Sequence, residues 1–190
     1  MIYDWKKIVK HGIPLLTICV CIEIFAGWIL QSDLNKDYSN LIRFPIFLIS
    51  IPVINSVGGN IGSVLGARLA SGLHVGYISI SAKDKKMHEN LLTSILIGVI
   101  VYLLLSIIIY YSVLFASMHT EHMISLLKFI TIVVGAGVLL VCIISLISVI
   151  TAFWSFKKGL DPDDTIAPVV TTVGDTLGIL FLFILIGVVV

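Results

Sequence analysis

The amino-acid sequence predicts an all-α polytopic membrane protein with five transmembrane helices. Hydrophobic residues make up 58% of the 190-residue chain and charged residues only 12%, whereas a soluble domain carries roughly 25% charged residues. Polar groups this scarce cannot cover the surface of a soluble protein of this size. The apolar residues also gather into five long stretches, and about 20 such residues are enough for a helix to cross ~30 Å of hydrocarbon.

The spans are expected at residues 12–30, 44–67, 91–116, 129–156 and 165–190. The first follows a group of lysines, as the apolar part of a signal peptide would. It is nevertheless long, contains Glu23, and ends in GWILQSD, which is not a small-residue cleavage site. No polar stretch is long enough to fold as an independent domain. We therefore expect a single transmembrane domain over residues 1–190 and no soluble domain.

Basic residues indicate how the spans are oriented, because they concentrate on the cytoplasmic side. With the N-terminus inside, nine basic residues face the cytoplasm: Lys6, Lys7, Lys10, Arg68, Lys83, Lys85, Lys86, Lys157 and Lys158. Three face outward: Lys36, Arg43 and Lys128. We therefore expect a multi-pass protein of the plasma membrane with its N-terminus in the cytoplasm and its C-terminus outside.

Charge and span number also limit the partners of the chain. The formal net charge is +1, and no basic domain is available to bind nucleic acid. An odd number of spans excludes an inverted repeat of two equal halves. Any symmetry that the molecule needs must therefore come from a second copy of the chain in the lipid bilayer.

Two acidic residues interrupt otherwise apolar spans. Asp175 lies about ten residues into the fifth span, so it is ~15 Å deep at about 1.5 Å per residue, and Glu23 lies at a similar depth in the first span. A charge at such a depth costs about 2.5–3.5 kcal/mol on insertion scales and is usually functional. The alternatives are a structural pair for Asp175, with Arg68 as its candidate partner, and a protonated, hydrogen-bonded Glu23.

The fifth span carries a polar stripe on one side. Ala167, Thr171 and Asp175 follow one another at intervals of four residues, and Asp164 lies eleven residues before Asp175. At about 3.6 residues per turn these four positions are nearly in line. A lipid-facing helix has no use for such a stripe, whereas the wall of a cation pathway does.

Three aspartates precede this stripe at the cytoplasmic start of the fifth span: Asp161, Asp163 and Asp164. Aspartate caps helix N-termini and interacts favourably with the helix dipole. One aspartate suffices for a cap, so attraction of cations to the mouth of a pathway is an equally good interpretation. The spacing is not that of an EF-hand loop, which needs a longer series of ligands.

The second span contains several helix-weakening residues, namely Pro52, Gly58, Gly59, Gly62 and Gly66. Small residues permit close helix packing or local unwinding toward a cavity, and both interpretations remain open. Packing alone does not account for Asn60, which lies about eight residues, or ~12 Å, from the cytoplasmic end. Its depth is close to that of Asp175.

Two segments resemble signatures of the MgtE and solute carrier family 41 magnesium transporters. They are PVINSVGGNIGSVLGARLASGLHVG from Pro52 to Gly76 and DPDDTIAPVVTTVGDTLG from Asp161 to Gly178. The resemblance implies a dimeric pore with the fifth spans at its axis. It implies that Asp175 is the main metal-binding residue and that Thr171 and Ala167 line the site. An amide is common in the family at the position of Ala167, where this chain has no polar side chain.

The resemblance also implies what the chain lacks. Bacterial members carry cytoplasmic regulatory domains, and eukaryotic members fuse two five-span halves; this chain corresponds to one half. We expect it to transport Mg²⁺, as cargo, through a homodimeric pore lined by the second and fifth spans. Asp175 carboxylates, Thr171 hydroxyls, Asn60 amides and retained waters suit this hard, hydrated ion.

Other metals and other functions find less support in the sequence. Four histidines, His74, His88, His119 and His122, lie in loops, and the cysteines, Cys19, Cys21 and Cys142, lie in apolar stretches. They form no zinc or copper set. No nucleophile–base set or phosphate-binding glycine loop is recognisable, so we expect no enzyme. The alternatives are a Na⁺/Mg²⁺ exchanger, a Mn²⁺ or Co²⁺ carrier, and a non-transporting membrane scaffold subunit.

Overall fold

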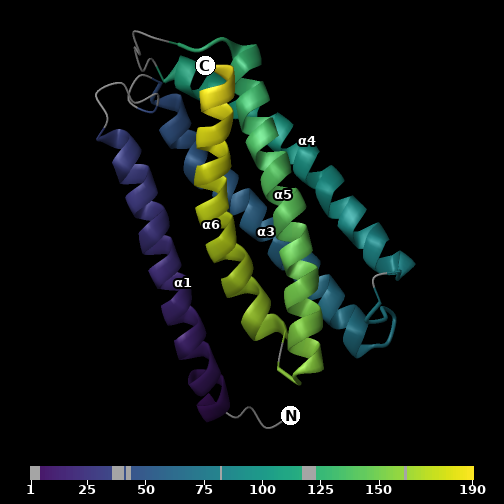
Figure 1. Ribbon diagram of the computed structural model, residues 1–190. Coiled ribbons are helices and arrows are strands. Elements are labelled where there is room, and N and C mark those ends of the chain that lie inside the picture. Colours follow the sequence, from purple (N-terminus) through teal and green to yellow (C-terminus); the bar gives the residue numbers. More distant parts are fainter. Residues whose placement is uncertain (1–4, 36–40, 42–43, 82, 117–122, 161) are drawn as a thin grey trace.

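The computed structural model describes residues 5–35, 41, 44–81, 83–116, 123–160 and 162–190. This part of the chain forms five long helices and no strand: α1 (Trp5–Leu34), α3 (Ile46–His74), α4 (Lys85–Phe115), α5 (Leu126–Lys157) and α6 (Pro162–Val189) (Figure 1). All five are long and apolar enough to cross a membrane. The predicted fold class is therefore confirmed, although α3 continues to His74, beyond the expected end of the second span.

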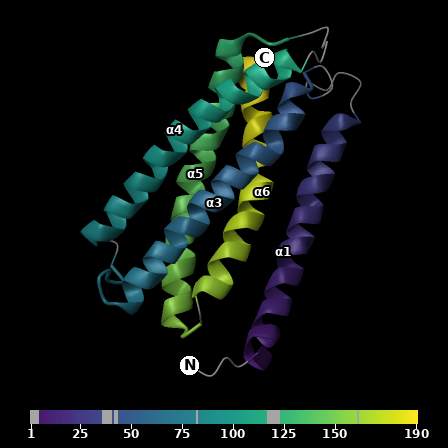
Figure 2. The ribbon, with the colours of Figure 1, turned by 180° about the vertical axis from the view of Figure 1, so that it is seen from behind.

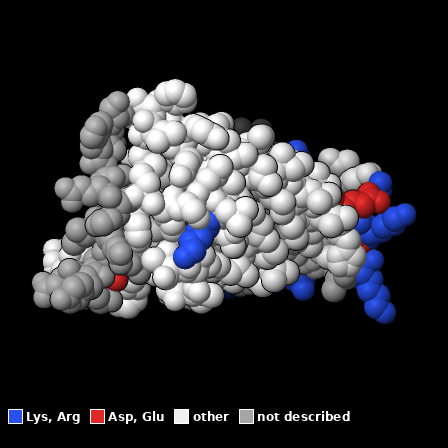
Figure 3. All heavy atoms as spheres, turned by 90° about the horizontal axis from the view of Figure 1, so that it is seen from above, with Lys and Arg blue, Asp and Glu red and all other residues white. Residues whose placement is uncertain are grey.

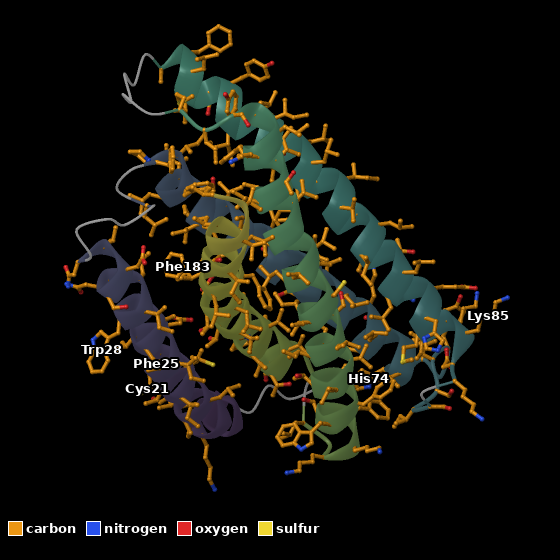
Figure 4. The ribbon with its side chains drawn as sticks, turned by 45° about the horizontal axis from the view of Figure 1, so that its top comes forward. Cys21, Phe25, Trp28, His74, Lys85 and Phe183 are labelled. Carbon is orange, nitrogen blue, oxygen red and sulfur yellow. The ribbon has the colours of Figure 1, made fainter. Side chains whose placement is uncertain are left out.

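Helix α6 lies at the centre of the bundle and packs against α1, α3 and α5. Helix α3 crosses the bundle diagonally and also contacts α4 and α5 (Figure 2). Helices α1 and α4 lie at opposite edges (Figure 1). Most of α1 outside its contact with α6 is exposed, and Cys21, Phe25 and Trp28 point away from the bundle (Figure 4). Exposed apolar side chains of this kind suit contact with lipid.

Glycines allow α3 to approach its neighbours closely. A Cβ atom at Gly62 would overlap Ile144 of α5 and Val170 of α6, and one at Gly66 would overlap Ile166 of α6. Small residues at helix contacts are typical of membrane proteins, where lipid provides no hydrophobic drive and association depends on packing. At these two positions the glycines of the second span are therefore packing residues.

The α3–α4–α5 contact is completed by Tyr102 of α4, which is fully buried. Its ring packs against Gly137 of α5. Its hydroxyl donates a hydrogen bond to the backbone oxygen of Ile54 in α3, at 2.8 Å. One side chain thus joins three helices and leaves no polar atom of its own unpaired in the apolar interior.

Charged side chains gather at the helix ends. Most of the face seen in Figure 3 carries no charge: a group of charged side chains lies at its right-hand edge, and a basic side chain lies near its middle. Because the helices alternate in direction, the start of α1, the α3–α4 turn and the α5–α6 turn lie at the same end as the N-terminus (Figure 1). Lys10, the lysines of the α3–α4 turn and the Lys157–Lys158 pair belong to that end. Lys36, Arg43, His119 and His122 lie outside the described residues.

Asp84 fixes the α3–α4 turn. Its carboxylate accepts hydrogen bonds from the Ser79 amide and hydroxyl, at 2.8 and 2.7 Å, and from the Met87 amide at the start of α4, at 3.0 Å. These bonds, those from Ser79 above all, lower the pKa of Asp84 from 3.8 to about 2. Because the pKa is lower in the folded state than in the unfolded chain, the hydrogen bonds to ionised Asp84 stabilise the fold above pH 3.8. That stabilisation is lost as the pH falls toward 2.

We predict that Gly62→Ala destabilises the bundle, because the new methyl meets β-branched side chains on two helices. Overpacking of this kind costs about 1–3 kcal/mol. Thermal unfolding of the purified protein should therefore shift to lower temperature. Gly27→Ala is the matched control, since nothing lies within 4 Å of a Cβ at that position in α1. Equal melting temperatures for the two variants would contradict the close α3–α6 contact.

Candidate functional site

The predicted stripe of the fifth span lies on α6, near its contacts with α1 and α3. Thr171 packs against Gly59 of α3. A Cβ atom added to Gly59 would lie only 3.3 Å from the Thr171 methyl, which shows how closely the two helices approach. The next residue, Thr172, faces α1 and is almost fully buried. Residues three and four apart share one face of a helix, so Asp175 lies above both threonines and between the two neighbouring helices. Asp175 is half-buried, whereas Ala167 and Thr171 are exposed.

Asn55 of α3 is the amide that meets Asp175. Its Nδ2 atom donates a hydrogen bond to the Asp175 backbone oxygen at 3.2 Å. Its Oδ1 atom is buried and has no hydrogen-bond partner. That oxygen points at α6 beside Gly178, where a Cβ atom would overlap it. The Asn55 side chain therefore faces α6 with a nitrogen atom that has a hydrogen-bond partner and an oxygen atom that has none.

Glu23 of α1 approaches α6 from the other side. The Thr172 hydroxyl donates a hydrogen bond to Glu23 Oε1 at 3.1 Å. One turn earlier, Cys19 Sγ lies 3.7 Å from the Pro168 oxygen. Both contacts join residues 149 apart, so α1 and α6 run parallel in constant register (Figure 1). The same offset places Ala26, which is 2% exposed, opposite Asp175.

Thr171 and Ala167 are connected along the helix. The Thr171 hydroxyl donates to the Ala167 oxygen at 2.8 Å and to the Pro168 oxygen at 3.2 Å. With its proton directed at the helix backbone, the hydroxyl oxygen keeps lone pairs for a cation. Ala167 offers only its backbone oxygen, so a side-chain role is absent there.

Asn60 lies on a different face of α3 from Asn55. Five residues on an α-helix correspond to a rotation of about 140°. Asn60 is exposed and donates to Ser56 Oγ at 3.4 Å. It lines an open groove of about 170 Å³ together with Ile61, Val64, Arg68, Ser94 and Ile97. Within one chain, therefore, the structure brings Asn55 to Asp175 and does not bring Asn60 or Arg68 there.

The aspartates before the stripe are only partly described. Asp164 is exposed near the start of α6, at the same end as the N-terminus. Asp163 belongs to the first turn of α6, but its side chain lies outside the described part, and so does the whole of Asp161. No group of three or more His, Cys, Asp or Glu side chains able to hold a metal occurs within the described residues.

Sequence reasoning missed the pairing of Asn55 and Glu23 with α6. Asn55 is a lone amide in an apolar helix, and it lies on the face that also contains Gly59, Gly62 and Gly66. A sequence signal was therefore present, because these four positions recur at intervals of three and four residues. Glu23 was recognised as an intramembrane acid, but nothing in its own span indicates the neighbour that it contacts.

Comparisons with known proteins identify the family of the chain. The MgtE family model, described as a divalent cation transporter, matches residues 51–185. Solute carrier family 41 member 3 of Mus musculus is 24% identical over 182 residues, covering 90% of this chain and 36% of that protein. The Rattus norvegicus protein of the same name is also 24% identical, with 90% and 38% covered.

The chain thus spans little more than a third of the length of these relatives. No solved structure matched it. The segment matched by the family model contains Asn55 and the whole of the α6 stripe, whereas Glu23 lies before it. Because that segment is well over half of the chain, the protein belongs to the MgtE family of divalent cation transporters.

Proposed function

We propose that this protein carries a divalent metal cation, Mg²⁺ foremost, across the membrane through a homodimeric pore lined by α3 and α6. One observation carries the proposal. Asp175 is an acidic residue within a membrane-crossing helix, and the exposed residues Thr171, Ala167 and Asp164 continue its stripe toward the end that bears the N-terminus. Family membership supports a divalent cation as the substrate.

The oxygen atoms along the stripe suit Mg²⁺. This ion prefers six oxygen ligands in octahedral geometry and releases its waters reluctantly. The Asp175 carboxylate supplies charge, while the Thr171 hydroxyl and the Ala167 backbone oxygen supply neutral contacts. Weak contacts through retained water allow the ion to leave again, as conduction requires. Asp161, Asp163 and Asp164 would concentrate cations at the mouth by charge alone, an effect that salt screens.

A second copy of the chain would cover the polar face of α3. Ser56 and Asn60 are exposed there, on a helix that otherwise crosses hydrocarbon. Polar side chains within a membrane face other helices or water-filled cavities rather than lipid. A dimer in which these faces meet would bring Asn60 of both subunits to the pore, although it is remote from Asp175 within one chain.

We further propose that the protein lies in the plasma membrane with its N-terminus in the cytoplasm and its C-terminus outside. The grouping of basic residues at one end of the bundle supports this orientation. In a variant without Cys19, Cys21 and Cys142, a cysteine placed at Lys85 or Lys158 should react with impermeant reagents only from the cytoplasmic side. Labelling from outside at either position would reverse the orientation.

The dimer is tested by crosslinking at two neighbouring positions. In the same cysteine-free background, Thr171→Cys should form a disulfide between subunits, because residue 171 lies on the exposed stripe. Thr172→Cys is the matched control: it is 2% exposed and faces α1 of its own chain. Crosslinking at 172 but not at 171 would refute an interface through this side of α6.

The role of Asp175 is tested by Asp175→Asn, which keeps the size of the side chain and removes its charge. We expect Mg²⁺ flux into reconstituted vesicles to be abolished while the protein remains folded and dimeric. Wild type should melt at higher temperature with Mg²⁺, since a ligand that binds only the folded state stabilises it. The variant should lose most of that gain.

Asp164→Asn is the matched control for charge at the mouth. It should reduce flux weakly, and added salt should diminish the difference from wild type as screening grows. Full Mg²⁺ transport by Asp175→Asn would contradict the proposed role of the Asp175 charge. Repeating the flux with Mn²⁺, Co²⁺ and an imposed Na⁺ gradient identifies the cargo and any coupling ion.

A further inference from the structure

We propose that Glu23 is a second cation-binding residue, so that each subunit by itself forms a divalent-cation site between α1, α3 and α6. Glu23, Thr172, Asp175 and Asn55 make up this site. The inference rests on the proposed transport function and goes beyond it, because Glu23 lies outside the segment that the family model matches.

The position of Glu23 is set by the packing of α1. Cys19 and Ala26 are buried among the side chains of α1 that the structure describes, and Glu23 lies between them on the same face. The residues on either side of it, Ile22 and Ile24, are 40% and 55% exposed. Glu23 is itself exposed, but its carboxyl group accepts the hydrogen bond from Thr172 and is thereby directed at α6.

The hydrogen bond from Thr172 indicates that this contact is specific. Two threonines of α6 donate to carbonyls of their own helix: Thr171 to Ala167 at 2.8 Å and Thr176 to Thr172 at 3.0 Å. A third, Thr165, forms a hydrogen bond with the Ser155 hydroxyl of α5 at 2.6 Å. Thr172 instead donates across to Glu23. Its proton is therefore occupied by the glutamate, and its remaining lone pairs are available to a cation.

Two acidic groups meet at this level of the bundle. Thr172 and Asp175 are three residues apart, so their Cβ atoms lie about 5–6 Å from one another on one face of α6. Glu23 accepts a hydrogen bond from the first of them. The residue opposite Asp175 in the helix register is the small Ala26, so α1 presents no large side chain to Asp175 at that position. Two like charges in a low-dielectric setting require a compensating cation or proton.

Asn55 supplies an independent indication of a ligand. It is 8% exposed, and its Oδ1 atom has no hydrogen-bond partner. Its Nδ2 atom donates to the Asp175 backbone oxygen, and Oδ1 is directed at α6 beside Gly178, about one turn after Asp175. A buried carbonyl oxygen without a donor is costly, and coordination to a cation would satisfy it.

The chemistry of these atoms identifies the ligand class. Two carboxylates, one amide oxygen and one hydroxyl oxygen are hard donors, with no nitrogen or sulfur among them. Such a set suits Mg²⁺, Mn²⁺ or Ca²⁺ and disfavours copper or zinc. Two carboxylates match the charge of a divalent ion. A dimer would then hold two cations, one in each subunit, with Asp175 as the boundary between each site and the pore.

The test compares Mg²⁺ flux and Mg²⁺-dependent melting for the full chain reconstituted in vesicles. Glu23→Gln keeps the side-chain length and an oxygen that accepts the Thr172 hydroxyl. We expect it to raise the half-saturating Mg²⁺ concentration at least about tenfold, the scale on which metal-site substitutions act. Glu89→Gln is the matched control, because Glu89 is exposed and pairs with Lys86 at 3.5 Å. It should leave the half-saturating concentration unchanged.

Glu23→Asp separates a ligand from a structural acceptor. A cation ligand needs the charge, so Glu23→Asp should bind Mg²⁺ more tightly than Glu23→Gln. A structural hydrogen-bond acceptor instead needs the length of the side chain, so Glu23→Gln would then bind Mg²⁺ more tightly than Glu23→Asp. That result would overturn the inference. Equilibrium binding should give two Mg²⁺ ions per wild-type dimer, and one per dimer would also overturn it.

Failure of the inference and failure of the proposed function give different results. If wild type and Glu89→Gln transport Mg²⁺ and Glu23→Gln has the same half-saturating concentration, the Glu23 site is refuted and the transport function stands. If wild type neither transports nor is stabilised by any divalent cation, the proposed function itself is refuted. If Glu23→Gln cannot be purified, the Mg²⁺ dependence of Glu23→Asp and the cation stoichiometry of wild type decide.

Discussion

A carboxyl group inside a membrane-crossing helix is the constraint on which the rest of this structure depends. An ionised Asp175 costs about 2.5–3.5 kcal/mol at the centre of a span, so α6 cannot simply face lipid. Its neighbours supply what lipid does not: Asn55 of α3 bonds its turn on one side, and Glu23 and Thr172 form a polar contact on the other. The central place of α6 in the bundle follows from this need.

The close approach of α3 to α6 links the stability of the bundle to its site. Gly62 and Gly66 let the two helices meet, and the same face of α3 then carries Asn55 to the level of Asp175. Dispersion contacts are the main attraction between helices in lipid. Packing at the glycines therefore holds the polar atoms in place. A change that separates α3 from α6 would lower the stability of the bundle and also disturb the site.

Much of the fold could be predicted from the sequence, because hydropathy and span length are strong signals in membrane proteins. The stripe of α6 was also predictable, since Ala167, Thr171 and Asp175 follow the helical period. The faces of α3 were not. Asn55 shares a face with Gly59, Gly62 and Gly66, whereas Asn60 does not, but hydropathy alone gives the two amides the same weight because both faces of a helix in hydrocarbon are apolar or small. The partner of Glu23 depends on helix packing, which a single span does not encode.

The central claim is that a divalent cation binds beside Asp175, and locating the ion tests it most directly. Mn²⁺ takes the same oxygen ligands as Mg²⁺ and scatters X-rays anomalously, so it can be placed in crystals of the dimer. The account predicts an anomalous peak beside the Asp175 carboxylate, between α1, α3 and α6, that disappears in Asp175→Asn. Peaks confined to the aspartates at the start of α6, or a peak that persists in the variant, would contradict it.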